Sequence, residues 1–240
     1  MLEKPIISTS IPTKLPFRQH CLIRRNFSLS ECGYASAKAF SDHAAEAGLA
    51  IPSEPIIFLK ANTAICGPNE KTLKPKHSTK LDYEVELGVV IGQQAKNVSK
   101  ANALKHVAGY CVVNDISERA FQMQSSQWDK GKGCDTFGPI GPWLVTTDEI
   151  PNPKNLNLRL DVNGKRMQTG NTKSMIFGVE EIVSYVSHYM TLLPGDVIAT
   201  GTPPGVGMGI KPEPFWLSVG DKVSLGIEGL GSQTQVIVGE

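Results

Sequence analysis

The sequence predicts a mainly β protein of the α+β class, with its strands curled into a mixed roll or barrel. Of its 240 residues, 40% are apolar and 20% are charged, which is ordinary for a globular domain. Short apolar segments alternate with turns rich in Gly and Pro, and only two or three segments have helical periodicity. Because strands and helices do not alternate regularly, a parallel sheet built from βαβ units is not expected.

The composition excludes several classes of function. The 24 basic and 23 acidic residues leave a net charge of +1, without the basic excess typical of nucleic-acid binding. No segment reaches the roughly 18 apolar residues of a membrane span. The five cysteines are scattered, with neither the spacing of a zinc site nor that of a disulfide framework. We therefore expect a cytoplasmic protein with reduced thiols that binds neither nucleic acid nor membrane.

The start of the chain differs from the rest, and we expect a basic arm over residues 1–39 and one domain over residues 40–240. Residues 4–30 contain no Asp or Glu, while five Lys and Arg residues are interspersed with Ser and Thr. A mitochondrial targeting segment has this composition, so such targeting stays open. A loosely ordered arm is the preferred interpretation, because three prolines would interrupt the amphipathic helix of a targeting segment.

The expected elements follow from their end signals. Ser41-Asp42 can cap a short helix that Gly48 ends. Asn163-Gly164 predicts a hairpin between residues 156–162 and 165–168. The remaining expectations are strands at 52–60, 83–92, 107–113, 197–200, 222–227 and 233–238, a helix from Ser117 through Gln122, a loop over 131–142 and a longer helix over 179–193.

Glu84 and Glu86 are candidate metal ligands. The strand period of two places both carboxylates on one face, where Gly88 is the next residue and leaves room. Asp115 follows the apolar run 107–113, at the point where the chain leaves a sheet. An all-oxygen set of this kind suits Mg²⁺, Mn²⁺ or Ca²⁺ better than Zn²⁺. The alternatives are an exposed face of an edge strand for the glutamates and an Asx turn for Asp115.

Two pairs of residues have a spacing of three, which places each pair on one face of a helix. Arg119 and Gln122 could bind a substrate carboxylate beside Asp115, or could be a surface pair. His43 and Glu46 lie at a helix start, where a histidine made more basic by a carboxylate could deprotonate water. An exposed pair in the first helical turn is the alternative.

The loop 201–207 is rich in Gly and Pro but lacks the Lys-Ser/Thr ending of a phosphate-binding loop. Because it follows a strand and is not followed by a helix, nucleotide binding is not expected. It could instead present backbone N–H groups and the Thr202 hydroxyl to a ligand.

From about Phe40 to the C-terminus, the chain resembles the fumarylacetoacetate hydrolase family. The stretch 127–139 is similar to the branch of ureidoglycolate lyases and diketo-deoxy-sugar-acid hydrolases. One departure is Ala37-Lys38-Ala39-Phe40, where family members usually have Gly-x-Asn-Tyr. The resemblance rests on six motifs in order: Asp42-His43-Ala44-Ala45-Glu46, Pro55-Ile56-Ile57-Phe58-Leu59-Lys60, Tyr83-Glu84-Val85-Glu86-Leu87-Gly88, Asn114-Asp115-Ile116-Ser117, Ser174-Met175-Ile176-Phe177 and Thr200-Gly201-Thr202-Pro203-Pro204-Gly205-Val206-Gly207.

The resemblance implies a β-roll with a short lid helix, a homodimer and one divalent ion, usually Mg²⁺. It implies metal ligation by Glu84, Glu86 and Asp115. It also implies a water-activating dyad on the lid and a group of residues that hold a 2-oxo acid. These are His43 and Glu46 for the dyad, and Lys60, Arg119, Gln122, Lys132 and Thr202 for the substrate.

The expected reaction is metal-dependent hydrolysis of a C–C bond in an acylpyruvate or a 2,4-diketo-3-deoxy sugar acid. Lys132 is the candidate for neutralising the pyruvate enolate that cleavage leaves. Isomerisation, decarboxylation or a lyase reaction on a 2-oxo acid are the alternatives, as is a non-catalytic, metal-dependent binder of oxo acids.

Overall fold

The computed structural model describes residues 14–16 and 53–240. The expected helix at Ser41, the residues His43 and Glu46 on it, and the domain boundary after residue 39 lie outside these residues. Within them, no helix is both long and apolar enough to cross a membrane.

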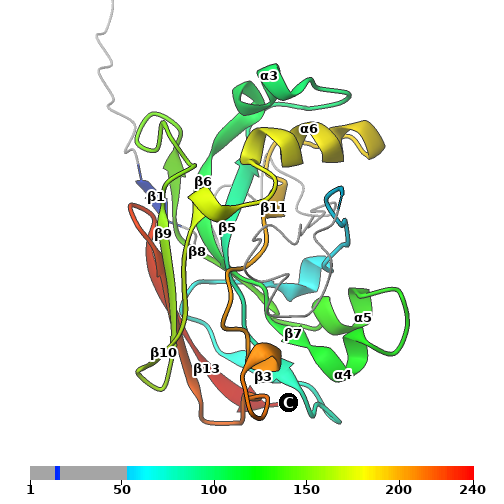
Figure 1. The fold of residues 1–240 in the computed structure, drawn as a ribbon, viewed down its shortest axis with the longest axis vertical. Coiled ribbons are helices and arrows are strands. Elements are labelled where there is room, and N and C mark those ends of the chain that lie inside the picture. The colour runs from blue at the N-terminus through cyan, green and yellow to red at the C-terminus, as the bar shows by residue number, and fades with distance from the viewer. Residues whose placement is uncertain (1–13, 17–52) are drawn as a thin grey trace, which may run out of the picture.

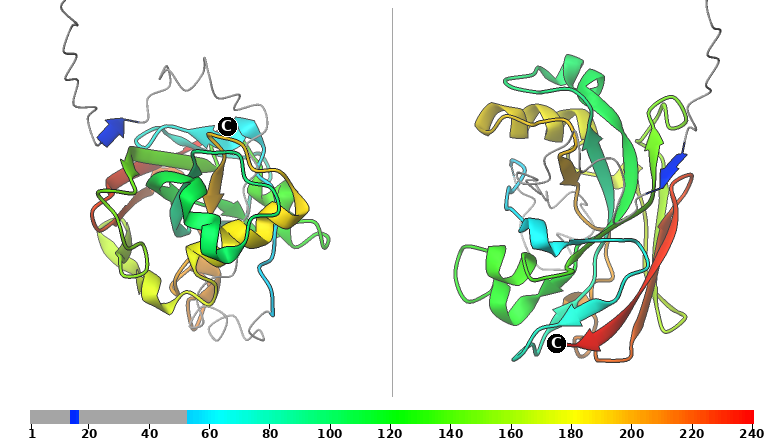
Figure 2. Two further views of the ribbon diagram at one scale, coloured as in Figure 1. Left: turned by 90° about the horizontal axis from the view of Figure 1, so that it is seen from above. Right: turned by 180° about the vertical axis from the view of Figure 1, so that it is seen from behind.

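Two sheets form the body of the fold, as Figures 1 and 2 show. One sheet has the strand order β1, β8, β6, β5 and β11, with β2 paired to β8. The bounds of these strands are β1 Lys14–Pro16, β2 Ile65–Cys66, β5 Val85–Ile91, β6 Val107–Asn114, β8 Gly138–Thr146 and β11 Val197–Ala199. The parallel pairing of β2 with β8 makes this sheet mixed.

The second sheet has the order β10, β9, β12, β13 and β3, and is antiparallel except for the β13–β3 pair. Its strands are β3 Thr72–Lys74, β9 Asn157–Val162, β10 Lys165–Asn171, β12 Lys222–Ile227 and β13 Gly231–Gly239. A short pair, β4 (Leu81–Asp82) and β7 (Ser117–Glu118), stands apart from both sheets.

Helices lie at the two ends of the roll: α3 and α6 at one end, and α4 and α5 at the other (Figures 1 and 2). Their bounds are α3 Lys100–Ala103, α4 Arg119–Gln122, α5 Asp129–Lys132 and α6 Val179–Tyr189, with 3₁₀ turns η2 Asn62–Ala64, η3 Leu104–His106, η4 Thr172–Ser174 and η5 Gly207–Gly209.

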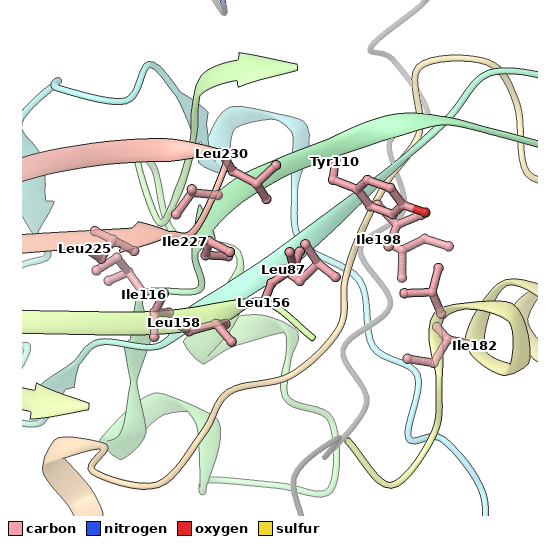
Figure 3. Packing of buried hydrophobic residues seen from close by; sticks show 14 of the residues in the cluster. Leu87, Tyr110, Ile116, Leu156, Leu158, Ile182, Ile198, Leu225, Ile227 and Leu230 are labelled. Carbon is pink, nitrogen blue, oxygen red and sulfur yellow. The ribbon is translucent and has the colours of Figure 1, made fainter. Parts of the chain in front are cut away.

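The two sheets enclose the main hydrophobic core. Figure 3 shows Leu87 of β5, Leu158 of β9 and Leu225 of β12 within one cluster, with Ile182 of α6 at its edge. The opposite face of β5 is also covered, because Val90 belongs to a second buried cluster that includes Cys111. Strand β5 is therefore a central strand buried on both faces, and the alternative of an exposed edge strand is wrong.

Most predicted elements are confirmed. The hairpin turn has positive φ at both Asn163 (51°) and Gly164 (80°), as a two-residue turn between twisted strands requires. Strands β5, β6, β11, β12 and β13 lie at the predicted places. Helix α6 ends at Tyr189, four residues before the predicted end at residue 193.

Three predictions of secondary structure are wrong. Residues 53–60 are not a strand, and the Leu59 amide donates to the Asp129 side chain instead of a neighbouring strand. The predicted loop 131–142 contains the end of α5 and the start of β8. Helix α4 is capped by Glu118, which accepts from the Ala120 amide, and not by Ser117.

Candidate metal centre

Three carboxylates converge where two neighbouring strands meet. Glu84 directly precedes β5, Glu86 lies within it, and Asp115 directly follows β6. The β5–β6 register pairs Val85 with Asn114 and so brings Asp115 opposite Glu84. One oxygen from each carboxylate lies within 4.8 Å of the others, and all three residues are buried.

Two lysines bind these carboxylates. Lys132 Nζ lies 2.8 Å from Glu84 Oε2 and 2.6 Å from Asp115 Oδ2. Lys60 Nζ lies 2.6 Å from Asp115 Oδ1 and also donates to the Ile116 carbonyl. Since both oxygens of Asp115 accept from lysines, an Asx turn is not the role of this side chain.

Glu86 is paired differently from the other two carboxylates. Its Oε2 accepts from the Gly201 amide at 2.7 Å, but its Oε1 is buried without a hydrogen-bond partner. Burial, together with the charges of Asp115 and Glu84, raises the pKa of Glu86 well above its usual value. A buried polar atom without a partner is costly, and a cation shared with the neighbouring carboxylates would satisfy it. The residues therefore fit a divalent ion that prefers oxygen ligands.

Burial and neighbouring opposite charges shift the pKa values of Glu84, Lys60 and Lys132. Burial alone would raise the pKa of Glu84, but the charges of Lys132 and Arg119 hold it below its usual range. Burial lowers the pKa of Lys60 in spite of Asp115. For Lys132, burial is outweighed by Asp115 and Glu84, which raise its pKa.

Arg119 is held by three side chains. Its Nε donates to Asp82 Oδ2 at 2.9 Å, its Nη1 to Gln122 Oε1 at 3.0 Å and its Nη2 to Glu84 Oε1 at 2.5 Å. Arg119 and Gln122 are only 4% and 6% exposed, so the alternative of a surface pair is wrong. Two of the five N–H groups of Arg119 are left by these bonds, enough to bind a carboxylate.

Asp82 belongs to the site but was not among the residues predicted from the sequence. Besides Arg119, it accepts from the Gly207 amide at 2.7 Å and from the Met208 amide at 3.1 Å. It continues the alternation of acidic residues, Asp82-x-Glu84-x-Glu86. This spacing of two was the signal that could have identified it.

Thr202 is buried in the loop after β11, and its hydroxyl has two partners. It donates to the Val85 carbonyl at 3.0 Å and accepts from Gln168 Nε2 at 2.7 Å. Gln168 is the second residue that the sequence reasoning missed. No local pattern could have identified it, because it lies on β10 in the other sheet.

The aromatic rings beside the two lysines help to exclude water. Lys132 Nζ lies 5.1 Å from the centre of the Phe58 ring, and Lys60 Nζ lies 6.0 Å from that of Phe137. Phe58 also packs against Trp128, with 5.5 Å between the ring centres. Within the described part of the chain, the site thus combines an acidic triad with buried cations under an apolar cover, which strengthens electrostatic interactions.

The fold and this site together define a class of protein, a β-roll with a buried carboxylate centre suited to a divalent cation. The sequence profile of the family described as "Fumarylacetoacetate (FAA) hydrolase C-terminal" matches residues 32–238. The chain belongs to the fumarylacetoacetate hydrolase family, whose members typically bind a divalent metal.

Similar proteins come from several bacteria. A protein of Burkholderia multivorans, provisionally named a hydrolase, is 61% identical over 82% of this chain and 70% of its own length. The crystal structure of 2-hydroxyhepta-2,4-diene-1,7-dioate isomerase from Mycobacterium marinum is 40% identical, with a TM-score of 0.77 over 88% of this chain and 76% of that one. Fumarylacetoacetate hydrolase from Exiguobacterium antarcticum is 38% identical, with a TM-score of 0.81 over 88% and 76%. These relatives support an enzymatic role.

Proposed function

We propose that this protein is a divalent-cation-dependent enzyme that hydrolyses a C–C bond in an acylpyruvate or a 2,4-diketo-3-deoxy sugar acid. The observation that carries the proposal is the buried triad, above all the unpartnered Oε1 of Glu86. A cation bound by Glu84, Glu86 and Asp115 would act as a Lewis acid toward the 2-oxo group of the substrate. Mg²⁺ is our first choice, and Mn²⁺ or Ca²⁺ would suit the same oxygen ligands.

The buried positively charged side chains of the site would bind and polarise the substrate. Arg119, kept in place by Asp82 and Gln122, has N–H groups left to bind the substrate carboxylate. Lys60 and Lys132 each have two acceptors in the protein and one remaining N–H. The remaining N–H of Lys132 would donate to the oxygen on which charge develops, the type of stabilisation that contributes most to catalysis of this kind.

Hydrolysis also requires an activated water. His43, oriented by Glu46, would take a proton from water as its oxygen attacks the distal carbonyl. The C–C bond then breaks with its electron pair on the pyruvate fragment, which gains a proton at carbon, while the other fragment leaves as a carboxylic acid. These two residues lie outside the described part of the chain, and their role rests on the sequence motif alone.

Isomerisation of an unsaturated 2-oxo or 2-hydroxy acid is the second candidate. It is favoured by the name of the M. marinum relative, an isomerase at 40% identity. The metal ion and the charged side chains of the site would stabilise the negative charge that develops when a proton leaves carbon. This reaction consumes no water. Decarboxylation or a lyase reaction would use the site in the same way.

The test is a turnover assay on a panel of acylpyruvates, diketo-deoxy acids and hydroxydienoates, with Mg²⁺ and with EDTA. Hydrolysis that depends on Mg²⁺ and collapses in a His43→Ala variant would support the proposal. Isomerisation that survives this substitution would favour the second candidate. No product from any substrate, together with Mg²⁺-dependent oxalate binding, would instead indicate a non-catalytic binder and refute the proposed function.

We also expect a cytoplasmic homodimer, as the family resemblance implies. Light scattering coupled to size-exclusion chromatography measures the oligomeric state directly. A mass of one chain, 25.9 kDa, would contradict this expectation.

A further inference from the structure

Gln168 is a buried amide that connects the second sheet to the candidate metal centre. It is 0% exposed, and its Oε1 accepts from the Val85 amide at 3.0 Å. Its Nε2 donates to Thr202 Oγ1 and to the Pro203 carbonyl, both at 2.7 Å. The amide thus uses both of its donors and its acceptor oxygen inside the protein.

A β-bulge brings this side chain into position. The pairing of β9 with β10 changes register between Arg166 and Gln168, so that Met167 is the extra residue. Bulges of this kind redirect side chains and are common beside active sites. The loop after β11 packs directly on the bulge, since a Cβ on Gly205 would lie 2.0 Å from the Met167 carbonyl oxygen.

Gln168 bonds to the two segments that position Glu86, namely the strand that carries Glu86 and the loop whose Gly201 amide binds it. Val85 is the residue between Glu84 and Glu86, so its amide fixes the strand that carries both carboxylates. Thr202 and Pro203 follow Gly201, whose amide binds Glu86 Oε2 at 2.7 Å. One amide therefore sets the distance between the ligand strand and the loop that orients Glu86.

Gln168 also fixes the direction of the Thr202 hydroxyl. Because Nε2 of Gln168 can only donate, Thr202 Oγ1 accepts from it and donates its own proton to the Val85 carbonyl at 3.0 Å. The hydrogen bond from Thr202 to the Val85 carbonyl thus connects the loop to β5, and it depends on the hydrogen bond that Gln168 donates to Thr202.

We propose that Gln168 is a positioning residue for the metal centre, which acts through Val85 and the 201–203 loop to hold Glu86 in its ligating geometry. The metal part of this proposal rests on the proposed function. A direct hydrogen bond to a ligating side chain is typically worth 10- to 100-fold in metal affinity, and because Gln168 acts one residue further away, we expect the lower end of this range.

The test compares Gln168→Met, which keeps the size of the side chain but none of its hydrogen bonds, with a matched control. Ser187→Ala is that control, because Ser187 is equally buried and links the Val98 amide to the Ser184 carbonyl away from the site. Mn²⁺ affinity is measured by calorimetry on the full chain, at a temperature where circular dichroism shows each variant folded. Amide hydrogen exchange of residues 85–89 and 200–202 is measured on the same samples.

We expect Gln168→Met to weaken Mn²⁺ binding about tenfold and to accelerate exchange in both segments. Ser187→Ala should bind Mn²⁺ within about twofold of the wild type. If Gln168→Met does not fold, Gln168→Asn replaces it, since it keeps an amide but is one methylene too short to reach both strand and loop.

Wild-type affinity and unchanged exchange in Gln168→Met would overturn the proposal, as would an equal loss of affinity in Ser187→Ala. If the wild type itself binds no Mn²⁺, the proposed function fails, and the exchange data then decide alone. Acceleration confined to residues 85–89 and 200–202 would support the positioning role, and its absence would refute it.

Discussion

Replacing Glu86 with glutamine should stabilise the metal-free protein while it removes metal binding. In the wild type, Glu86 Oε1 is buried without a partner, and one oxygen of Glu86 lies within 4.8 Å of an oxygen of Asp115 and of Glu84. The glutamine carbonyl keeps the bond from the Gly201 amide, and its NH₂ group would donate to the neighbouring carboxylates. The substitution thus replaces a carboxyl group that must keep a proton in the folded state with a neutral group that needs none.

The size of the effect follows from the raised pKa of Glu86. Above its ordinary pKa of 4.5, the unfolded chain loses the Glu86 proton while the folded chain keeps it. The folded state then binds more protons, so its stability falls as pH rises, by about 1.4 kcal/mol per pH unit, until the folded pKa is passed. Relative to the wild type, Glu86→Gln should therefore gain stability as pH rises from 5 to 7, by up to about 1.4 kcal/mol per pH unit, and each 1 kcal/mol corresponds to about 2–4 °C in Tm.

Chemical and thermal unfolding in EDTA at pH 5, 6 and 7 measures this difference, in which the titrating groups away from the site cancel. Adding Mn²⁺ should reverse the order, because a cation at 100 times its Kd stabilises the wild type by about 2.7 kcal/mol and the variant by much less. A variant that is less stable than the wild type in EDTA at pH 7 would refute the reasoning. So would a difference in stability that does not change with pH.

Three further predictions concern packing, substrate binding and thiol chemistry. Gly88→Ala places a Cβ 2.5 Å from Cys111 Sγ and should lower the free energy of unfolding in urea by about 1–3 kcal/mol. A second change, Cys111→Ala, should recover part of this free energy, and full additivity of the two losses would contradict this prediction. Asp82→Asn removes the charge that holds Arg119 Nε and should raise KM for the oxo acid about tenfold or more, whereas an unchanged KM would show that Arg119 does not need this partner. Partial burial raises the pKa of Cys66 to about 12, so its thiolate fraction at pH 8 is roughly 1000-fold below that of an unfolded chain. Alkylation, followed by peptide mass spectrometry, should therefore be more than about tenfold slower than in an unfolded control, and equal rates would contradict this shift.

The metal centre could be predicted from the sequence because its signals are local. Glu84 and Glu86 alternate within one apolar strand, and Asp115 ends the next long apolar run. Since the two runs pair as adjacent antiparallel strands, their polar ends meet. The same alternation extended by two residues would also have predicted Asp82.

Gln168 could not be predicted in this way. It bonds to Val85, which lies 83 residues earlier, and does so from the opposite sheet across the core. Such a contact depends on how the sheets pack and on the bulge at Met167, and neither follows from local periodicity.

A run of apolar residues predicts that a segment is buried more reliably than it predicts that the segment pairs with another strand. Residues 56–59 form such a run, and Phe58 is buried, but the segment has no strand neighbour and is held by Asp129, 70 residues later. Conversely, β8 contains Pro139 and Pro142, which favoured a loop. Pro142 is accommodated where the β6–β8 pairing is irregular, between Tyr110 and Val112, and Pro139 lies near the start of β8, where it is the register partner of Cys66 in β2.

The central claim is that Glu84, Glu86 and Asp115 hold one divalent cation. Anomalous diffraction from crystals grown with Mn²⁺ tests it most directly, because the signal locates the ion without reference to any assumed role. We predict one strong anomalous peak per chain, within about 2.0–2.5 Å of an oxygen from each of the three carboxylates. The absence of a peak there, or a peak bounded by other residues, would contradict the account.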